Sequence, residues 1–209
     1  MIGTHDSFTY LNTGNIFIDL FNMFWRCQVK TLDEQYELGV RVFDIRVIAV
    51  KKEGMICWEV GHGIARVKQY FVNLEDICIY FKENYPGSFV RIMLEKNGND
   101  LGIRASFEKE AVEVIQKYGD MIWTIYVKNP WICMYSNKKF KEVKDTCCHL
   151  FNWHIDKDLL TNIKNFEFSS GSIKGWAKKH NPSKITKEMI EDKNTLYFMD
   201  YVGVYPIIK

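Results

Sequence analysis

Two of the five histidines lie in short glycine-containing motifs at points where a strand is expected to end. His5 is the central residue of GTHDS (residues 3–7), after a first short strand. His62 is the central residue of GHG (61–63), just past a second strand. Glycines on both sides of His62 offer no side chain that would bury its imidazole. Because imidazole titrates near neutral pH, the two histidines could serve as general base and general acid; the alternative is that both are structural.

An arginine and two aspartates stand in otherwise apolar strands. Period-two alternation in VFDIRV (42–47) places Asp44 and Arg46 on one face, and Asp200 interrupts the apolar stretch FMDY (198–201). Such charges are costly unless they are paired or functional, so a local Asp44–Arg46 salt bridge is the alternative to a functional role. Two histidines, an arginine and an aspartate suit metal-free cleavage of a phosphodiester. The histidines would act as base and acid, the arginine would neutralise phosphoryl charge, and the aspartate would fix the tautomer of the base.

Hydrophobic periodicity predicts the elements that must position these residues. The expected strands and helices alternate along the chain, which favours an α/β fold with a largely parallel sheet. In an α/β barrel the functional residues would meet at the carboxyl ends of the strands. No repeat or linker divides residues 1–209, so one domain is expected. The predicted strands are 42–47, 55–60, 89–94, 121–127, 131–135, 166–168 and 196–202, and the predicted helices are 74–84, 105–118, 139–150 and 182–192.

The composition excludes several classes of protein. Hydrophobic residues make up 47% of the 209 residues, as in an ordinary globular domain, so a mainly disordered chain is excluded. The net charge of +2 gives no general affinity for nucleic acid. No apolar run approaches the ~20 residues that a transmembrane helix needs. The N-terminus does not resemble a signal peptide, which predicts a cytoplasmic location for the chain as it stands and secretion if the natural start carries a signal.

The six cysteines include no C-x-x-C pair and fit a reducing compartment. Cys147, Cys148 and His149 could form a metal patch with His154, but their spacing matches no zinc pattern. Buried or surface thiols are the alternative. The sequence predicts neither a metal nor another cofactor.

The three N-terminal motifs, GTHDS (3–7), GVRVFDIR (39–46) and GHG (61–63), together resemble the X-domain of bacterial phosphatidylinositol-specific phospholipase C. The order of helix, proline turn and strand over 74–94 is similar to the family as well. Three C-terminal segments also resemble the family: 166–171, 181–182 and 198–202. Residues 139–146 match it less closely. The resemblance implies a distorted, shortened TIM-type barrel that cleaves phosphatidylinositol.

The resemblance also implies roles for individual residues. His5 would take the proton from the inositol 2-hydroxyl, which then attacks phosphorus. Arg46 would stabilise the charged transition state, and His62 would protonate the departing diacylglycerol oxygen. Asp200 corresponds to the carboxylate that orients the base, and Asp6 to one that assists the acid. The products would be diacylglycerol and a cyclic inositol phosphate.

Two supporting positions are matched less closely. Asp44 corresponds to a supporting acid of the family, and Lys96 lies near a family lysine that contacts substrate, although Glu95 is nearer in register. Arg46 stands where eukaryotic relatives bind calcium, so the resemblance implies no metal requirement. The metal-binding Glu-x-Asp pattern of glycerophosphodiester phosphodiesterases is also replaced here, by Asp44-Ile45-Arg46.

The sequence departs from the family in three places. The chain starts within the family's first strand and ends soon after Asp200, so the barrel is expected to be shortened at both ends. A family strand with the pattern RGKIVLL is not found, because residues 119–138 are too few to hold it. Its substrate contact would have to come from Trp131, Tyr135 or Lys128.

An aromatic stripe follows the first motif. Phe17, Phe21, Phe24 and Trp25 recur at helical spacing, which predicts an amphipathic helix. In the resembling family a short helix at this place dips into the bilayer interface. Phe21, Phe24 and Trp25 are therefore the candidates for membrane contact, and packing in the core is the alternative.

The leading expectation is a metal-independent phosphodiesterase that acts as a monomer on phosphatidylinositol-type lipids at a membrane surface. Two alternatives remain open. One is the same barrel with an altered substrate, such as a glycosylated inositol lipid or a soluble phosphodiester. The other is a truncated, inactive relative that binds lipid or inositol phosphate.

Overall fold

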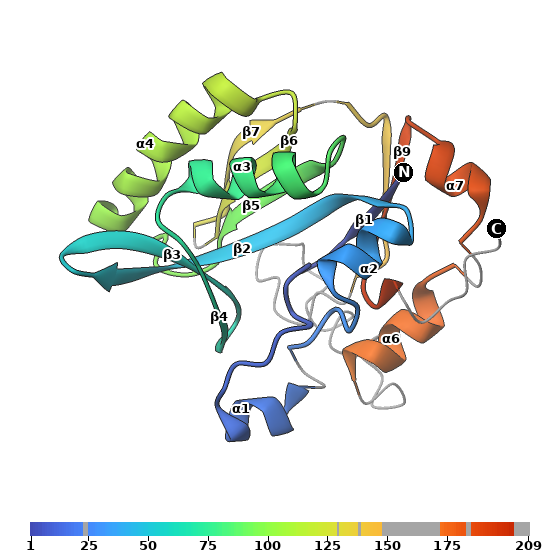
Figure 1. Ribbon diagram of the computed structural model, residues 1–209, viewed down its shortest axis with the longest axis horizontal. Coiled ribbons are helices and arrows are strands. Elements are labelled where there is room, and N and C mark those ends of the chain that lie inside the picture. The colour runs from blue at the N-terminus through green and yellow to red at the C-terminus, as the bar shows by residue number, and fades with distance from the viewer. Residues whose placement is uncertain (23–24, 129, 138, 148–171, 183–184, 203–209) are drawn as a thin grey trace.

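The computed structural model describes residues 1–22, 25–128, 130–137, 139–147, 172–182 and 185–202. Helices pack around one mixed β-sheet (Figure 1). The strands are β1 (Ile2–Thr4), β2 (Val40–Lys52), β3 (Met55–His62), β4 (Ala65–Phe71), β5 (Phe89–Leu94), β6 (Ile122–Val127), β7 (Ile132–Ser136), β8 (Glu142–Asp145) and β9 (Thr195–Met199). The helices are α1 (Ile16–Leu20), α2 (Leu32–Glu37), α3 (Leu74–Asn84), α4 (Leu101–Tyr118), α6 (Ile173–His180) and α7 (Lys187–Glu191).

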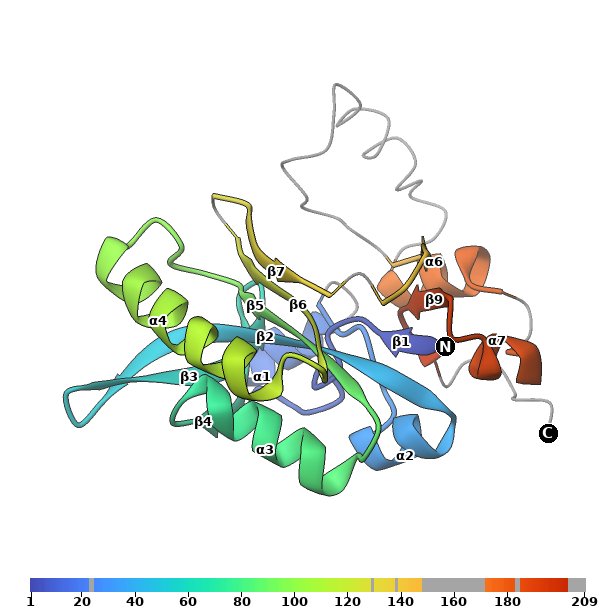
Figure 2. The ribbon, with the colours of Figure 1, turned by 90° about the horizontal axis from the view of Figure 1, so that it is seen from above.

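The sheet runs in the order β7-β6-β5-β2-β1-β9-β8 and curls into a half-barrel (Figure 2). The pairs β6–β5, β5–β2, β2–β1, β1–β9 and β9–β8 are parallel. The long β2 continues past them and pairs antiparallel with β3, which pairs with β4. Within the described residues no pairing joins β7 to β8, so the barrel stays open between these two strands. This is the α/β architecture of a distorted, shortened TIM-type barrel, as the sequence predicted.

The alternation predicted for β2 determines which side chains can reach a site. Phe43 and Ile45 point into the main core, whereas Val42 belongs to a separate cluster on the opposite face of the sheet. Asp44 and Arg46 share the face of Val42, since side chains two residues apart point the same way. The charged pair therefore faces the interior of the half-barrel and not the helices.

Helix α3 covers the face of the sheet that carries Phe43 and Ile45, and it has the predicted bounds. Asn73 caps its first turn in a capping box with Asp76. Its buried stripe ends at Phe81, whose ring lies 5.1 Å from that of Phe43 on β2. The helix stops at Tyr85, and Gly87 then takes φ +76°, a left-handed conformation that favours glycine. Strand β5 follows with the predicted bounds and pairs with β2 in parallel.

Several predicted elements need correction. Residues 142–145 form strand β8 and not part of a helix, because they pair in parallel with β9. In the region 182–192 the described helix is limited to Lys187–Glu191. Strand β4 and the helices α2 and α6 were not predicted from periodicity. The predicted strand over 166–168 lies outside the described residues.

The segment between β6 and β8 is short, as the sequence indicated. In its described part the chain forms β7, which turns back antiparallel on β6 with Ile132 opposite Val127. The described residues between β6 and β8 contain no parallel strand. No helix in the described part of the chain is both long and apolar enough to span a membrane.

Candidate active site

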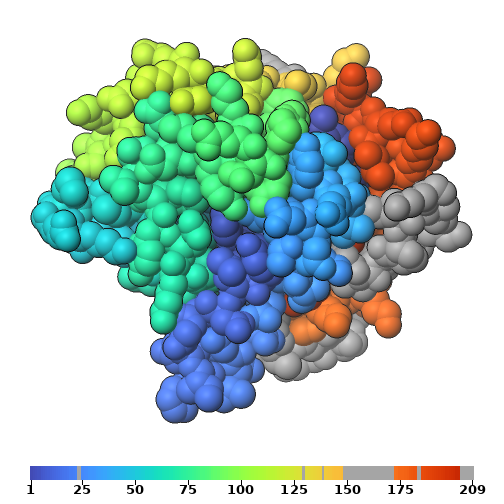
Figure 3. Space-filling view, in the orientation of Figure 1, coloured from blue at the N-terminus to red at the C-terminus, as the bar shows by residue number. Residues whose placement is uncertain are grey.

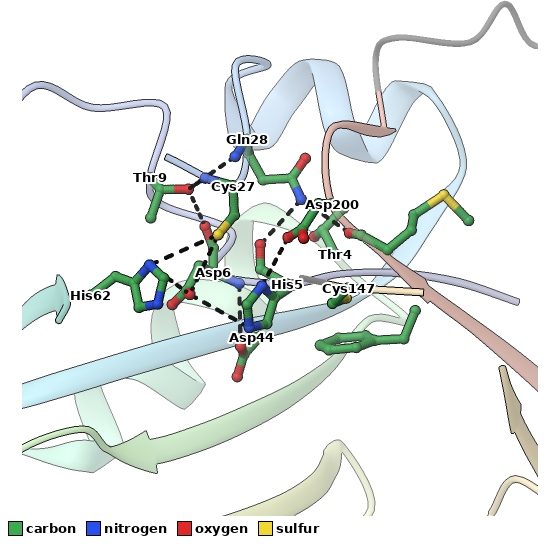
Figure 4. A network of polar contacts seen from close by, with 12 residues as sticks. Thr4, His5, Asp6, Thr9, Cys27, Gln28, Asp44, His62, Cys147 and Asp200 are labelled. Carbon is green, nitrogen blue, oxygen red and sulfur yellow. Dashed lines mark hydrogen bonds and ion pairs between the residues drawn. The ribbon is translucent and has the colours of Figure 1, made fainter. Parts of the chain in front are cut away.

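The predicted catalytic residues meet at one edge of the sheet, although they come from distant parts of the chain. Figure 4 shows four of them: His5, Asp6, His62 and Asp200. His5 directly follows β1, Arg46 lies on β2, His62 ends β3, and Asp200 directly follows β9. Strands β1, β2 and β9 are parallel neighbours, so their carboxyl ends lie on the same side. Asp6 takes φ +47°, which turns the chain sharply after β1 and is a conformation that aspartate tolerates.

The His5 imidazole is buried between an aspartate and an arginine. Its Nδ1 lies 2.8 Å from Oδ1 of Asp200, and its Nε2 accepts a hydrogen bond from Nη2 of Arg46. Because a carboxylate accepts the Nδ1 proton, Nε2 is the nitrogen left with a lone pair. Gln28 fixes the backbone around this pair by donating to the carbonyls of His5 and Met199, both at 3.1 Å. His5 is therefore arranged as a base whose lone-pair nitrogen, Nε2, accepts from Arg46.

His62 is the most accessible histidine of this cluster, with 17% of its side chain exposed. Its Nδ1 donates to the carbonyl of Trp25 at 2.8 Å and lies 3.3 Å from Oδ2 of Asp6. No hydrogen bond to its Nε2 is found in the described part of the chain. The rings of His5 and His62 lie 5.9 Å apart. A single phosphate group could therefore contact both imidazoles.

A tight hairpin positions His62. A Cβ atom on Gly61 would lie 2.5 Å from the carbonyl oxygen of Ala65, so only glycine allows β3 and β4 to approach this closely. Gly63 takes φ +57°, and its N–H donates to Oε1 of Glu95 at 3.2 Å. The GHG motif thus holds His62 on a tight turn that is tied to Glu95, directly after β5.

Arg46 lies among three buried carboxylates of the described structure. Its Nε is 3.0 Å from Oδ1 of Asp6 and 3.1 Å from Oδ2 of Asp44, and its Nη1 is 3.3 Å from Oε2 of Glu95. Burial alone would lower the pKa of Arg46, but these carboxylates hold it well above its ordinary value. The local Asp44–Arg46 pair exists, yet it is one part of a larger network. Asp44 also lies 3.6 Å from Nε of Arg91.

Glu95 was not assigned a role from the sequence, yet it is central to this network. It contacts Arg46, the Gly63 N–H and, at 2.7 Å, Nζ of Lys128. Burial opposes its ionisation, but Arg46, His62 and Lys128 together lower the pKa of Glu95 to about 2. Continuing the alternation of β5 beyond Leu94 would have placed Glu95 on the face of Arg91.

Lys96 is the next residue after Glu95, so the same alternation places it on the opposite face. It is half-buried and forms no hydrogen bond or ion pair with the described residues, so the structure places Glu95, not Lys96, at the site. Lys128, one of three substitutes considered for the missing substrate contact, does reach the network. The other two, Trp131 and Tyr135, form no contact with it; Trp131 packs on Tyr126.

The acidity of Asp6 leads to a stability prediction. Burial raises the pKa of Asp6 from 3.8 to about 6, although Arg46 and His62 lower it. The folded state therefore binds a proton at a higher pH than the unfolded state does. The free energy of unfolding should rise as the pH falls from 7 to 4, by up to about 3 kcal/mol from this group. In Asp6→Asn that contribution should be absent, which urea titrations of both proteins at several pH values can measure. A difference between the two proteins that stays constant with pH would contradict the assignment.

Two buried thiols flank the site, and neither was assigned to it from the sequence. Sγ of Cys27 lies 3.7 Å from Oδ2 of Asp6 and 3.8 Å from Nδ1 of His62. Cys147 offers a ligand atom within 4.8 Å of His5 and Asp200. The other residues of the metal patch considered from the sequence, Cys148, His149 and His154, lie outside the described residues.

The predicted membrane helix is only partly as expected. Phe21 is 60% exposed, but Trp25 is only 5% exposed and its Nε1 donates to the carbonyl of Ile18 at 2.9 Å. The prediction that Trp25 contacts a membrane is therefore wrong, because its indole packs in the core. Phe24 lies outside the described residues. Helix α1 protrudes from the body (Figure 3), and four large apolar side chains there are exposed: Ile16, Phe17, Leu20 and Phe21.

Comparisons with known proteins bear on the fold. No family model matches the sequence, and no curated protein matches it. Among solved structures, the phosphatidylinositol-specific phospholipase C from Listeria monocytogenes is similar with a TM-score of 0.51 and 17% identity, over 96% of this chain and 87% of that one. A mutant of the enzyme of the same name from Staphylococcus aureus gives 0.52 and 15%, over 97% and 86%. The chain has the fold of bacterial phosphatidylinositol-specific phospholipase C, which confirms the predicted resemblance at the level of fold.

Proposed function

We propose that the protein is a metal-independent phosphodiesterase that cleaves phosphatidylinositol-type lipids to diacylglycerol and a cyclic inositol phosphate. The observation that carries the proposal is the 5.9 Å separation of the His5 and His62 rings beside a buried arginine. A carboxylate lies at Nδ1 of each imidazole, Asp200 for His5 and Asp6 for His62, and Asp6 also lies 3.6 Å from Nε2 of His5. The lipid headgroup is inferred from the fold shared with enzymes of that name.

The fixed charges around the two histidines nearly balance. The described side chains in mutual contact comprise four carboxylates (Asp6, Asp44, Glu95 and Asp200) and three fixed cations (Arg46, Arg91 and Lys128). One negative charge therefore remains when both imidazoles are neutral. Arg46 donates to Nε2 of His5, whereas Nδ1 of His62 faces Asp6. The proposed reaction begins with His5 neutral and His62 protonated.

The proposed reaction gives each of these residues one step. A substrate hydroxyl replaces Arg46 at Nε2 of His5 and loses its proton there as its oxygen attacks phosphorus. The Arg46 guanidinium, released from His5, pairs with the phosphoryl oxygens as charge develops on them. His62 gives its Nε2 proton to the departing glycerol oxygen, and Asp6 stabilises the imidazolium beforehand. The His5–Asp200 hydrogen bond stabilises the imidazolium formed on His5.

No metal ion is needed in this scheme, because Arg46 supplies the positive charge that a cation would supply elsewhere. Diacylglycerol release from phosphatidylinositol vesicles in the presence of EDTA tests the proposal. We expect turnover in EDTA that is unchanged by added Ca²⁺. A strict calcium requirement would contradict the role of Arg46, and vesicle binding without turnover would favour an inactive lipid-binding protein.

We also propose that the protein acts as a monomer at the lipid surface and contacts the membrane through α1. Phe17 and Phe21 are both mostly exposed on the protruding helix, where apolar side chains can enter the interface. The double substitution Phe17→Ala and Phe21→Ala should weaken binding to vesicles about tenfold or more and leave the unfolding midpoint unchanged, since neither ring is buried. Sedimentation with sucrose-loaded vesicles measures the binding.

The matched control for this prediction removes an exposed apolar residue elsewhere. Leu101 is exposed at the start of α4, so Leu101→Ala should bind vesicles as the wild type does. Equal binding of the double variant and the wild type would exclude α1 as the contact surface.

A further inference from the structure

Three potential metal ligands that lie far apart in the sequence meet beside the proposed catalytic acid: Cys27, Asp6 and His62. Oδ2 of Asp6 lies 3.3 Å from Nδ1 of His62 and 3.7 Å from Sγ of Cys27, and Sγ lies 3.8 Å from Nδ1. Figure 4 shows the thiol and the imidazole directed at the same carboxylate. The proposed reaction uses Asp6 and His62 but gives the thiol no part.

These separations fit a tetrahedral metal ion. With zinc bond lengths of about 2.0–2.1 Å to oxygen and nitrogen and about 2.3 Å to sulfur, neighbouring ligand atoms lie roughly 3.3–3.6 Å apart. The three observed distances are within a few tenths of an ångström of that range. His5 also offers a nitrogen within 4.8 Å of Asp6 and Cys27. A thiolate, an imidazole and a carboxylate are the ligand types that Zn²⁺ prefers.

The surrounding charges also allow a cation here. Asp6 divides its oxygens between two tasks, since Oδ1 contacts Arg46 while Oδ2 faces the thiol and the imidazole. The Arg46 charge is met by Asp44 and Glu95 in addition to Asp6. Oδ2 therefore has negative charge left for a second cation.

We propose that Cys27, Asp6 and His62 bind a thiophilic divalent cation of the Zn²⁺ type, and that the bound ion inhibits the enzyme. Binding the ion releases two protons to solvent, one from the Cys27 thiol and one from Nδ1 of His62, whose hydrogen bond to Trp25 is lost. His62 then keeps its Nε2 proton on a neutral, metal-bound ring, which is a much weaker acid than imidazolium. The inhibitory part rests on the proposed function, whereas metal binding does not.

Titration with Co²⁺ tests the binding without reference to activity. We expect a thiolate-to-cobalt charge-transfer band and a tetrahedral visible spectrum in the wild type, both displaced by Zn²⁺. Cys27→Ser should lose the charge-transfer band and weaken Zn²⁺ binding about a hundredfold or more in competition with a chromogenic chelator, since even indirect partners of a metal ligand contribute tenfold to a hundredfold. Cys27→Ala provides the same test if the serine variant does not fold.

Two control variants make the assignment specific. Cys133 is exposed and distant in the sheet, so Cys133→Ser should retain the band. Cys147 belongs to the alternative ligand group with His5 and Asp200, so Cys147→Ser should retain it as well. Absence of the band in the wild type, or its loss in Cys147→Ser and not in Cys27→Ser, would overturn the proposal.

Activity measurements then test the inhibition. Micromolar Zn²⁺ should slow the wild type and Cys133→Ser, EDTA should restore both, and the Zn²⁺ concentration needed to inhibit Cys27→Ser should be at least about tenfold higher. A wild type that binds Co²⁺ through Cys27 but cleaves no lipid would contradict the proposed function and leave the metal site standing. Inhibition that is equal in all three proteins would overturn the inhibitory role.

Discussion

Replacing His62 with alanine should slow cleavage of phosphatidylinositol by a factor of about 10²–10⁴, but should slow cleavage of a p-nitrophenyl inositol phosphate far less. The reason is that a general acid matters only when the leaving oxygen needs a proton. Diacylglycerol leaves as a poor alkoxide unless it is protonated, whereas p-nitrophenolate leaves unaided. Initial rates on the two substrates, measured for the same enzyme preparation, provide the comparison.

His5→Ala is the matched control for this prediction. A general base acts on the attacking hydroxyl, which is the same in both substrates, so the loss of His5 should slow both reactions by similar factors. The 2.8 Å contact of its Nδ1 with Asp200 leaves Nε2 for this task. If His62→Ala slowed both substrates equally, the assignment of His62 as the acid would be wrong.

Arg46→Ala should cause the largest loss of stability of any single substitution at the site. Arg46 is the shared partner of Asp6, Asp44 and Glu95. Its removal takes the arginine from buried Asp6 and leaves Asp44 with only Arg91 and Glu95 with only Lys128 among their described cation partners. Breaking one partner of a buried ion pair typically costs about 3–5 kcal/mol of folding free energy. The variant should also be inactive, because it loses the guanidinium that contacts His5 and would pair with the phosphoryl oxygens. Urea unfolding monitored by tryptophan fluorescence measures the first effect.

The control for Arg46→Ala is an arginine in a pair whose two members are both partly exposed. Arg104 lies 2.7 Å from Glu108 one turn further along α4, so Arg104→Ala should cost about 1 kcal/mol or less. Arg46→Lys separates charge from geometry: it keeps one positive charge but cannot contact three carboxylates and a phosphate in the same plane. It should recover part of the stability and little of the activity. An Arg46→Ala protein as stable as the wild type would contradict the central place given to this network.

The parts of the site that could be predicted were those with a local signal. Alternation within VFDIRV placed Asp44 and Arg46 on one face, and the glycines marked the turn that carries His62. The expected parallel barrel was enough to bring His5 and Asp200 to the same side of the sheet, because parallel neighbours end on the same side. The last strand was predicted over 196–202, whereas β9 ends at Met199, directly before Asp200. The distance between the rings of His5 and His62 could not be predicted, since the position of His62 depends on the antiparallel hairpin of β3 and β4.

The parts that could not be predicted depend on contacts between distant segments. Cys27 lies in no recognisable motif and reaches Asp6 only because the loop after α1 folds back on the end of β1, where its N–H is fixed by Thr9 at 2.9 Å. Trp25 shares helical spacing with exposed aromatics, yet α1 ends before it and the indole packs inward. Strand β8 has the sequence EVKD, with one apolar residue, and all four of its side chains are exposed. Its sequence therefore carries no strand pattern, and its parallel pairing with β9 is what defines it as a strand.

The central claim is that the inositol hydroxyl attacks phosphorus under the control of His5, Arg46 and His62. The measurement that tests it most directly is a phosphorus NMR time course with phosphatidylinositol in EDTA. We expect a cyclic phosphodiester signal to appear first with the wild type, and no such signal with His5→Ala or His62→Ala. An acyclic inositol phosphate as the first product, or a cyclic signal that persists in both variants, would contradict it.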